Sequence, residues 1–466
     1  MLLSSSTYFV FLAALFFLYW PAARIRAFAL ALILFANYFF YAKWDLFYLF
    51  LIPAASAVDY TIGYCLGRAE TPPIRRLLVG LSVAVNVGLL ATLKYTPFAL
   101  QNWGWLTGRP VPEWRWTFAL GISFYAFQAL TYTIDIYRRD AEPSRSLLAH
   151  FAAVSFFPTT LAGPIARMST LVPQFEKFRP LEAAEGGRAL FLIGLGLAKK
   201  FLIADYLADN IVNRVFDLPR LYSGLEVLAG VYAYALQLYF DFSGYTDIAL
   251  GSALLLGIKL PINFNQPYAA VNIADFWRRW HISLSNWLRD YLYFSLPGKR
   301  SRSGPYLNLV LTMAIGGLWH GASWNFVVWG LLHGFALALT RAVQAWRKNP
   351  PARTEWWALA GRRFATAQFV CFAWIFFRAP DLASAGAILE QIASFTFSLA
   401  NLPPQILFVM AVALVAHYLP RRWYEISQQL YVRAPFYAQA ATLAALIVAL
   451  QFVASTGAVP FIYTRF

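Results

Sequence analysis

Residues 316–325 read Gly316-Gly317-Leu318-Trp319-His320-Gly321-Ala322-Ser323-Trp324-Asn325, and this stretch joins two apolar segments, Tyr306–Leu318 and Asn325–Leu339. Glycine lets a backbone break or come close to another chain. The pattern therefore predicts that one membrane helix ends here and the next begins. His320 is then expected near bilayer depth, where non-helical backbone survives only if it is buried in protein or lines a cavity.

The composition of the whole chain supports a membrane protein. Of its 466 residues, 60% are hydrophobic and 13% are charged, whereas soluble chains carry about 25% charged residues. The formal net charge is +16. In a membrane protein an excess of positive charge first indicates the orientation of the helices. It is also compatible with binding to anionic lipid headgroups or to an anionic substrate that donates a chemical group. No soluble basic domain exists to carry nucleic-acid binding.

Apolar segments recur along the chain, and a helix needs about 20 mostly apolar residues to cross the hydrocarbon core. Besides the two segments above, the candidates are Leu2–Trp20, Ala27–Tyr41, Leu46–Leu66, Leu77–Tyr95, Thr117–Ile136, Ala189–Ile203, Leu225–Phe240, Asp247–Ile258, Phe364–Phe377, Gln405–Leu419 and Tyr437–Val453. Several of these segments are shorter than about 20 residues, which is typical of tilted or re-entrant segments in a large bundle. We expect His150–Ala162 to be a further short segment of this kind. No repeat or linker divides the chain, so we expect one all-α polytopic domain over 1–466, with its chemistry at about 150–340.

Basic residues predict the orientation of the helices. The loops after the first, third and fifth apolar segments carry Arg24, Arg26, Arg68, Arg75, Arg76, Arg138, Arg139 and Arg145. By the positive-inside rule these loops are cytoplasmic, so the N-terminus is expected outside. Arg421, Arg422 and Arg433 mark a later cytoplasmic loop.

A second histidine lies in an amphipathic stretch, Asp275–Tyr291. Four side chains with helical spacing share one face: Trp277, His281, Leu284 and Leu288. Arg278 and Arg279 lie largely elsewhere, and Asp275 fits an N-cap. The stretch predicts one amphipathic helix that lies in the membrane interface or lines a donor site. Taken by its spacing alone, His281 is better explained as a hydrogen-bonded packing residue.

Carboxylates also occur in apolar sequence. Asp241 and Asp247 flank Ser243-Gly244, and this pattern predicts a helix break with carboxylates beside it. A structural role is favoured for both: capping a helix end or pairing with Arg278 or Arg279.

His320 has two interpretations of equal weight from spacing alone. As a neutral imidazole, it would take a proton from a hydroxyl that attacks a thioester carbonyl; as a packing residue, it would cap a helix between two Trp rings. His333 fits a packing role, while His150 and His417 sit at segment edges and look interfacial. His281, His320 and His333 lack the local spacing of zinc ligands, so no metal site is expected.

Several stretches closely resemble the membrane-bound O-acyltransferase family, in the branch of the alginate O-acetyltransferase membrane subunit and the D-alanyl transferase of teichoic acids. The matching stretches are Tyr239–Ala249, Pro261–Tyr268, Phe276–Ser285, Trp287–Tyr293 and Gly317–Trp324, with Tyr38–Trp44, Phe157-Pro158, Ala162–Ile165 and Pro173–Phe175 in support. One departure is Ser295-Leu296-Pro297-Gly298-Lys299-Arg300, where the alginate-type pattern resembles Pro-Leu-Gly-Gly-Asn.

The resemblance implies that the family's catalytic histidine is His320 and its second motif histidine is His281. It also implies a bundle of about 11–14 transmembrane, re-entrant and interfacial helices around a central funnel in the inner (cytoplasmic) membrane. The further residues expected to line the site or bind the donor are Arg278, Arg279, Trp319, Asn325 and Asp241. No bound cofactor is implied.

The implied reaction moves an acyl group, acetyl in this branch, from a cytoplasmic thioester to an exported polysaccharide. The donor would be acyl-CoA, such as acetyl-CoA, or an acyl-carrier thioester. Expected partners are membrane lipids, the polysaccharide acceptor and a periplasmic or membrane-anchored acetyltransferase of the hydrolase-like SGNH type. Two alternatives stay open: transfer of D-alanyl or another acyl group, and a transporter or flippase without chemistry. The second would show inverted repeats, and none is evident.

Overall fold

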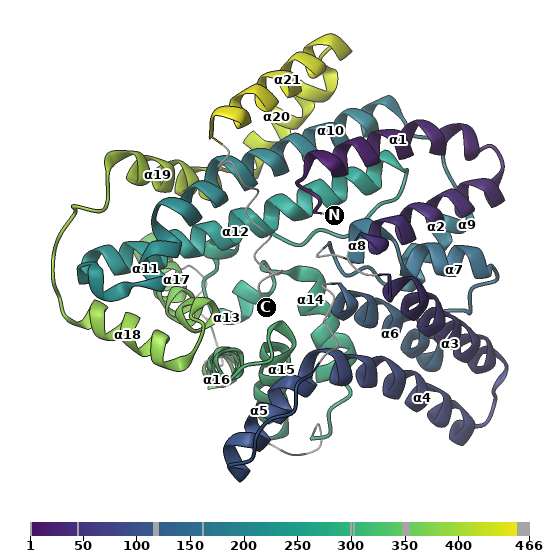
Figure 1. The fold of residues 1–466 in the computed structure, drawn as a ribbon, viewed down its shortest axis with the longest axis horizontal. Coiled ribbons are helices and arrows are strands. Elements are labelled where there is room, and N and C mark those ends of the chain that lie inside the picture. Colours follow the sequence, from purple (N-terminus) through teal and green to yellow (C-terminus); the bar gives the residue numbers. More distant parts are fainter. Residues whose placement is uncertain are drawn as a thin grey trace. The chain divides into compact units, whose positions relative to one another are not determined.

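The computed structural model describes residues 2–43, 46–114, 121–160, 163–298, 301, 303–346 and 355–453. Within these ranges every regular element is a helix, which confirms the all-helical fold class (Figure 1). Features predicted at Trp44, Thr117, Ala162, Lys299 and Arg300 lie outside the described residues. The chain falls into two compact units, each assembled from two separate stretches of sequence.

The first unit comprises Met1–Ile193 and Tyr245–Ile262. Its helices are α1 (Ser6–Ala22), α2 (Arg26–Ala42), α3 (Tyr48–Arg68), α4 (Pro72–Leu90), the π-helical η1 (Ala91–Tyr95), α5 (Thr96–Thr107), α6 (Ile122–Arg138), α7 (Leu147–Val154), α8 (Phe157–Thr160), α9 (Met168–Glu176) and most of α10 (Ala183–Ala198). Helices α3, α4 and α6 pack against one another, and α2 packs against α1 and α7 (Figure 1).

One buried arginine holds two helix ends of this unit together. The guanidinium of Arg75, near the start of α4, donates to the carbonyls of Leu66 and Ala69 at the end of α3. It also donates to the carbonyls of Ile136 and Tyr137 at the end of α6, both at 2.8 Å. The last carbonyls of a helix lack partners within the helix and carry partial negative charge, so a cation there satisfies both needs.

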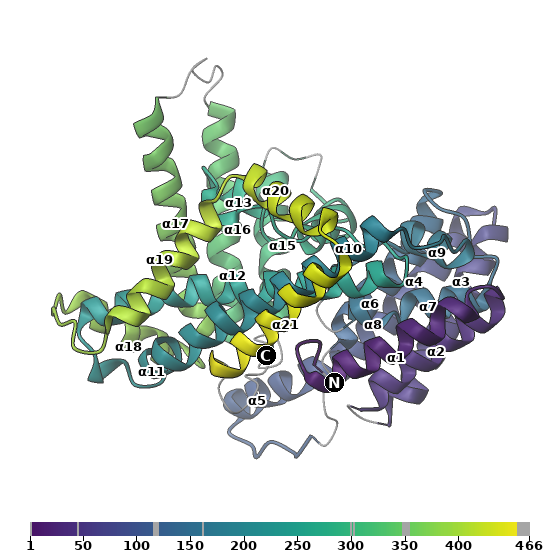
Figure 2. The ribbon, with the colours of Figure 1, turned by 90° about the horizontal axis from the view of Figure 1, so that it is seen from above.

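The second unit comprises Gly194–Gly244 and Asn263–Phe466. Its helices are η2 (Lys199–Asp205) and η3 (Ala208–Val212), both π-helical, α11 (Asn213–Asp217), η4 (Pro219–Leu221), most of α12 (Gly224–Leu255), η5 (Pro267–Ala269), α13 (Ile273–Trp277), α14 (Ile282–Trp287), the π-helical η6 (Leu288–Tyr293), α15 (Gly304–His320), α16 (Trp324–Trp346), α17 (Trp356–Arg378), α18 (Leu382–Ala393), α19 (Pro404–Tyr418), α20 (Arg421–Arg433) and α21 (Phe436–Val453). Figure 2 shows α16 and α17 side by side as two long helices.

Three helical stretches among the described residues are long and apolar enough to cross a membrane: Tyr48–Arg68, Pro72–Thr107 and Trp324–Trp346. The count rises to four if α19 and α20, which are bent by 91° at a short break, form one span. Shorter apolar helices accompany them, such as α1, α2 and α21. Long spans mixed with short apolar helices agree with the tilted or partly buried segments expected from the sequence.

The helix break predicted at Ser243-Gly244 is wrong, because α12 runs without interruption for 32 residues. The glycine serves close packing instead. A Cβ added to Gly244 would lie 2.7 Å from the carbonyl oxygen of Gly196, so only glycine lets the two backbones approach this closely.

The contact between α15 and α16 also depends on glycine. A Cβ on Gly317 would overlap the carbonyl oxygen of Phe326, and a Cβ on Gly330 would overlap that of Met313. Gly316, which precedes Gly317, differs. The nearest atom to a Cβ added at Gly316 would be the side-chain Cδ1 of Leu288, at 3.2 Å. The two adjacent glycines therefore carry different constraints, one from backbone and one from a movable side chain.

We expect Gly317→Ala to push α15 and α16 apart and to lower the free energy of unfolding by about 1–3 kcal/mol, the usual cost of overpacking. Gly316→Ala is the matched control, since Leu288 can change rotamer and alanine favours a helix by up to about 1 kcal/mol over glycine. Thermal unfolding of the purified variants in detergent measures both. Equal loss of stability in the two variants would contradict this account of the interface.

Candidate active site

His320 is the last residue of α15 and is 4% exposed. Three aromatic rings surround its imidazole. The ring centroids of Trp319, Trp329 and Phe377 lie 4.9, 5.1 and 5.3 Å from that of His320. Trp319, predicted to line the site, therefore contacts the imidazole directly.

The chain leaves the helix directly after His320. Gly321 is extended, and α16 begins at Trp324, so the break predicted from the glycine pattern is confirmed. The side-chain amide of Asn325 donates to the carbonyl of Ala379, which follows the last residue of α17, at 2.8 Å. Asn325 thus ties the start of α16 to the end of α17, beside the break that presents His320.

His281 also lies at a break. The single amphipathic helix predicted over Asp275–Tyr291 is wrong: α13 and α14 are separate, and η6 follows α14. His281 has φ 40° and ψ 56°, a left-handed conformation that is uncommon outside glycine and costs of order 1–3 kcal/mol. The predicted apolar face is nevertheless buried, and His281 itself is 0% exposed.

Asn263 supports the turn at His281. Its carbonyl accepts the backbone N–H of Ile282 at 2.9 Å, and its side-chain oxygen accepts the backbone N–H and the hydroxyl of Ser283 at 3.2 and 2.6 Å. These bonds satisfy donors at the start of α14 that have no partner within the helix. The ring of Phe242 then packs edge-on against His281, with centroids 4.7 Å apart.

One aromatic cluster contains the surroundings of both histidines. Trp280, which precedes His281, contacts Trp374 with ring centroids 5.1 Å apart. Trp374 stacks on Trp329 at 5.8 Å, and Trp329 is one of the rings on His320. Rings of this size bury large apolar areas and fix one another's orientation. The two histidines are therefore held by a common rigid support.

The two arginines next to His281 pair locally. Arg279 Nε and Arg278 Nη2 lie 3.1 and 3.5 Å from the same carboxylate oxygen of Asp275. Asp275 is not the N-cap that the sequence suggested, because Asn272 takes that role by accepting the Asp275 N–H. The side chain of Arg278 is 68% exposed, and exposed ion pairs contribute little energy. Arg278 can therefore exchange Asp275 for an anionic ligand at low cost.

Asp241 does not pair with these arginines, as one interpretation of the sequence expected. It pairs with Lys200 of η2, whose ammonium lies 2.7 Å from Asp241 and 2.8 Å from Asp205. All three side chains are buried. The pairing partner lies about forty residues earlier in the sequence, so α12 is fastened to η2 by charge at the position next to Phe242.

Sequence reasoning missed Lys200 and Asn263. A signal for Lys200 existed: it is a lysine in an apolar run, followed by Asp205, and charged groups in such runs are rare unless they are paired or functional. It also lies in a π-helical segment, a feature frequent at functional sites. Asn263 gave no such signal, because its role depends on contacts with residues about twenty positions away.

The remaining histidines are packing residues. His333 accepts a hydrogen bond at Nδ1 from the indole N–H of Trp277 at 3.3 Å, in agreement with its predicted packing role. His150 and His417, predicted to be interfacial from their places at segment edges, are both buried in protein. His417 Nε2 accepts the backbone N–H of Tyr268 at 3.2 Å. Among the described residues no group of three His, Cys, Asp or Glu side chains is arranged to hold a metal ion.

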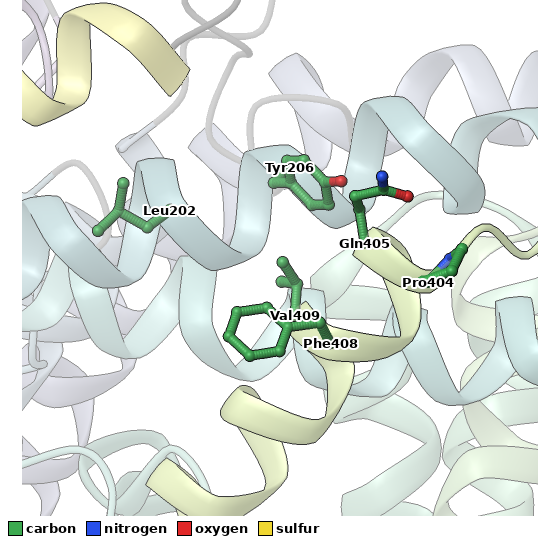
Figure 3. A pocket seen from close by; sticks show the side chains of 6 residues that line it. All are labelled: Leu202, Tyr206, Pro404, Gln405, Phe408 and Val409. Carbon is green, nitrogen blue, oxygen red and sulfur yellow. The ribbon is translucent and has the colours of Figure 1, made fainter.

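An open apolar groove of about 470 Å³ also lies in the second unit (Figure 3). Its lining residues are Leu202, Tyr206, Pro404, Gln405, Phe408 and Val409. In Figure 3 the side chains of Tyr206 and Gln405 are the polar ones among the labelled lining residues, and the other four side chains are apolar. None of the predicted site residues lines it, so the groove is not the site at His320.

The regular elements of the described residues are all helices, and several of these helices are long and apolar enough to cross a membrane, which indicates an integral membrane protein. His320 lies buried at a helix break within it. The chain belongs to the membrane-bound O-acyltransferase family, which its residues 113–379 match. It is therefore a membrane O-acyltransferase, which decides against the alternative of a transporter without chemistry.

The chain is also similar to individual members of the family from several bacteria. The chain is 40% identical to the "Probable alginate O-acetylase AlgI" of Azotobacter vinelandii, over 84% of this chain and 78% of that protein. It is 38% identical to a peptidoglycan O-acetyltransferase of Helicobacter pylori, over 76% of this chain and 72% of that protein. A teichoic acid D-alanyltransferase of Bacillus subtilis is 31% identical, over 55% and 68% of the two chains.

We expect Lys200→Met to lower the free energy of unfolding by about 3–5 kcal/mol, because it leaves two buried carboxylates without their cation. The triple variant Lys200→Met, Asp205→Asn, Asp241→Asn removes the charges together and should regain most of that loss. Thermal unfolding in detergent, with the amount of protein inserted in membranes, measures both. A triple variant as unstable as the single one would show that charge is not the cause.

Proposed function

We propose that this O-acyltransferase moves an acetyl group from a cytoplasmic thioester, acetyl-CoA or an acyl-carrier protein, to a polysaccharide exported across the inner membrane. The observation that carries the proposal is His320, buried at a helix break in a chain 40% identical to an alginate O-acetylase over 84% of its length. The multi-pass orientation set by the basic loops supports the cytoplasmic entry of the donor.

The proposed chemistry needs one base. His320 takes the proton of the acceptor hydroxyl while the hydroxyl oxygen attacks the thioester carbonyl. The C–O bond forms, the C–S bond breaks, and the proton passes from the imidazole to the departing thiolate. Protons and charges therefore balance without a cofactor.

The other site residues have positioning and binding roles in this proposal. His281 orients the reacting groups from the turn that Asn263 supports. Arg278 and Arg279 bind the anionic part of the donor, since Arg278 is exposed and is paired only at the surface. Trp319 and Asn325 hold the His320 end of the site, while Asp241 fixes α12 through Lys200.

Access to His320 requires movement of its neighbours. With an exposed fraction of 4%, His320 leaves too little room for a thioester and a sugar hydroxyl to meet at the imidazole. Trp319 and Phe377 both pack on the ring. Movement of either aromatic ring, or of the break that begins at Gly321, would open the funnel expected for this family.

The likeness to alginate-type proteins also suggests the fate of the acetyl group. We propose that it passes to a periplasmic or membrane-anchored partner of the SGNH type, which modifies the polymer. The second candidate reaction is D-alanyl transfer to a cell-envelope polymer, favoured by the likeness to a teichoic acid D-alanyltransferase. Its lower identity and coverage make acetyl transfer the better supported of the two.

We expect His320→Ala to lower acetyl transfer by about 10²–10⁴-fold, the usual contribution of a general base, while the protein remains inserted in the membrane. Purified protein in liposomes, given radiolabelled acetyl-CoA and a soluble sugar acceptor, provides the measurement. His333→Gln is the matched control: it alters a buried histidine of the same aromatic cluster, keeps an acceptor for Trp277, and should retain most activity. Unchanged transfer in His320→Ala would refute the catalytic assignment.

The same preparation separates the two donors. Consumption of a D-alanyl carrier thioester in place of acetyl-CoA, still dependent on His320, would reject acetyl transfer and keep the role of His320. Turnover of neither thioester, with the wild-type protein folded and inserted, would reject both reactions as proposed.

We expect the substitution His281→Asn to remove the imidazole while the backbone keeps its left-handed conformation, because asparagine tolerates that conformation better than most residues. His281→Asn should therefore fold normally and lose acetyl transfer through kcat more than through KM, the pattern of a group that acts in the transition state. His281→Ala, which lacks that tolerance, should in addition be less stable. An active His281→Asn enzyme would reduce His281 to a packing residue.

A further inference from the structure

Helix α20 differs from the helices on either side of it. It contains three arginines and one glutamate in 13 residues, and none of its residues is buried. It is bent by 91° from α19, and Figure 2 shows the two helices meeting at an elbow. After Ala434-Pro435 the chain continues into the apolar α21.

The neighbouring helices expose apolar side chains. On α19 the exposed large residues are Leu407, Phe408, Val412, Leu414 and Val415, and on α21 they include Ile447 and Val448. In a membrane protein such surfaces face lipid tails. A helix with four charged residues cannot follow them into hydrocarbon at acceptable cost, so α20 is placed where both neighbours end, at the membrane surface.

One face of α20 is apolar. Trp423, Ile426 and Leu430 follow the spacing i, i+3 and i+7, which sets them on one stripe of a helix. Trp423 is 58% exposed and Leu430 is 67% exposed. Tryptophan favours the boundary between lipid tails and water, and a polar helix with an apolar stripe typically lies in that plane.

The arginines of α20 are not equivalent. Arg421 pairs with Glu425 one turn later, with Nε 2.9 Å from the carboxylate oxygen. Arg422 and Arg433 have no ion-pair partner among the described residues. They are eleven residues apart, which is about three turns, so both lie along the same edge of the apolar stripe, next to Ile426.

We propose that α20 lies in the membrane interface with Trp423, Ile426 and Leu430 among the lipid tails, and that Arg422 and Arg433 bind the phosphate groups of acidic phospholipids. The lipid occupant follows from three observations: the elbow at an apolar helix, the exposed apolar stripe, and the unpaired cations along its edge. Arginine binds phosphate through paired N–H donors, and basic residues at a membrane surface are attracted to anionic headgroups.

Spin labels on single cysteines test the placement of α20. The full chain with Cys65→Ser and Cys371→Ala is reconstituted in lipid nanodiscs, and labels are introduced at 423, 426, 430, 425 and 429 in turn. We expect oxygen, which concentrates in lipid, to collide most with labels at 423, 426 and 430. A water-soluble nickel chelate should collide most with labels at 425 and 429. Chelate access to all five positions would overturn the proposal.

A protein contact would give a third pattern. Labels at 423, 426 and 430 that are shielded from both oxygen and chelate would mean that another protein surface, such as a second copy of the chain, covers the stripe. That result would also overturn the proposal.

Charge substitutions test the headgroup assignment separately. The label at 430 should lie deeper in nanodiscs of mixed phosphatidylglycerol and phosphatidylcholine than in nanodiscs of phosphatidylcholine alone. The double variant Arg422→Gln, Arg433→Gln should abolish this difference. Arg421→Gln, which removes an arginine already paired within the helix, should keep it. Loss in both variants, or in neither, would reject phosphate binding by Arg422 and Arg433.

Discussion

Backbone groups at buried helix ends need hydrogen-bond partners within the protein, and the two breaks at the candidate active site depend on this constraint. Asn263 supplies acceptors for the backbone of Ile282 and for Ser283, so the chain can turn sharply at His281. Asn325 donates to the carbonyl of Ala379, which directly follows α17, beside the break after His320. Without such partners these buried helix ends would each cost free energy comparable to a lost hydrogen bond.

Close packing then converts these local solutions into a fixed geometry. Helices α15 and α16 approach closely at Gly317, and the indoles of Trp329 and Trp374 fill the space beyond the histidine. The charged contact of Lys200 with Asp241 fastens α12 at the position next to Phe242, whose ring lies against His281. A site that needs its catalytic groups held closely in place gains from such rigid support on both sides.

Much of this arrangement was predictable from the sequence, and the limits have physical causes. The glycines around His320 predicted the helix break correctly, because glycine weakens a helix and its presence in an apolar run indicates a local change of backbone conformation. The same reasoning gave a wrong result at Gly244. There glycine allows the close approach of the backbone at Gly196, and the sequence does not show that these two positions meet. The partners of Asp241 and the turn at His281 depend on Lys200 and Asn263, contacts from remote positions that no local pattern contains.

The clamp at Arg75 has a consequence for how the protein is made. Its guanidinium loses water only where the ends of α3 and α6 both offer carbonyls. While the chain is being synthesised, α3 and α4 emerge well before α6, so this arginine keeps its hydration at the membrane edge until the later helix arrives. Arrival of α6 therefore completes the set of carbonyls that holds this guanidinium, and α3, α4 and α6 can be fastened together only from that point in synthesis.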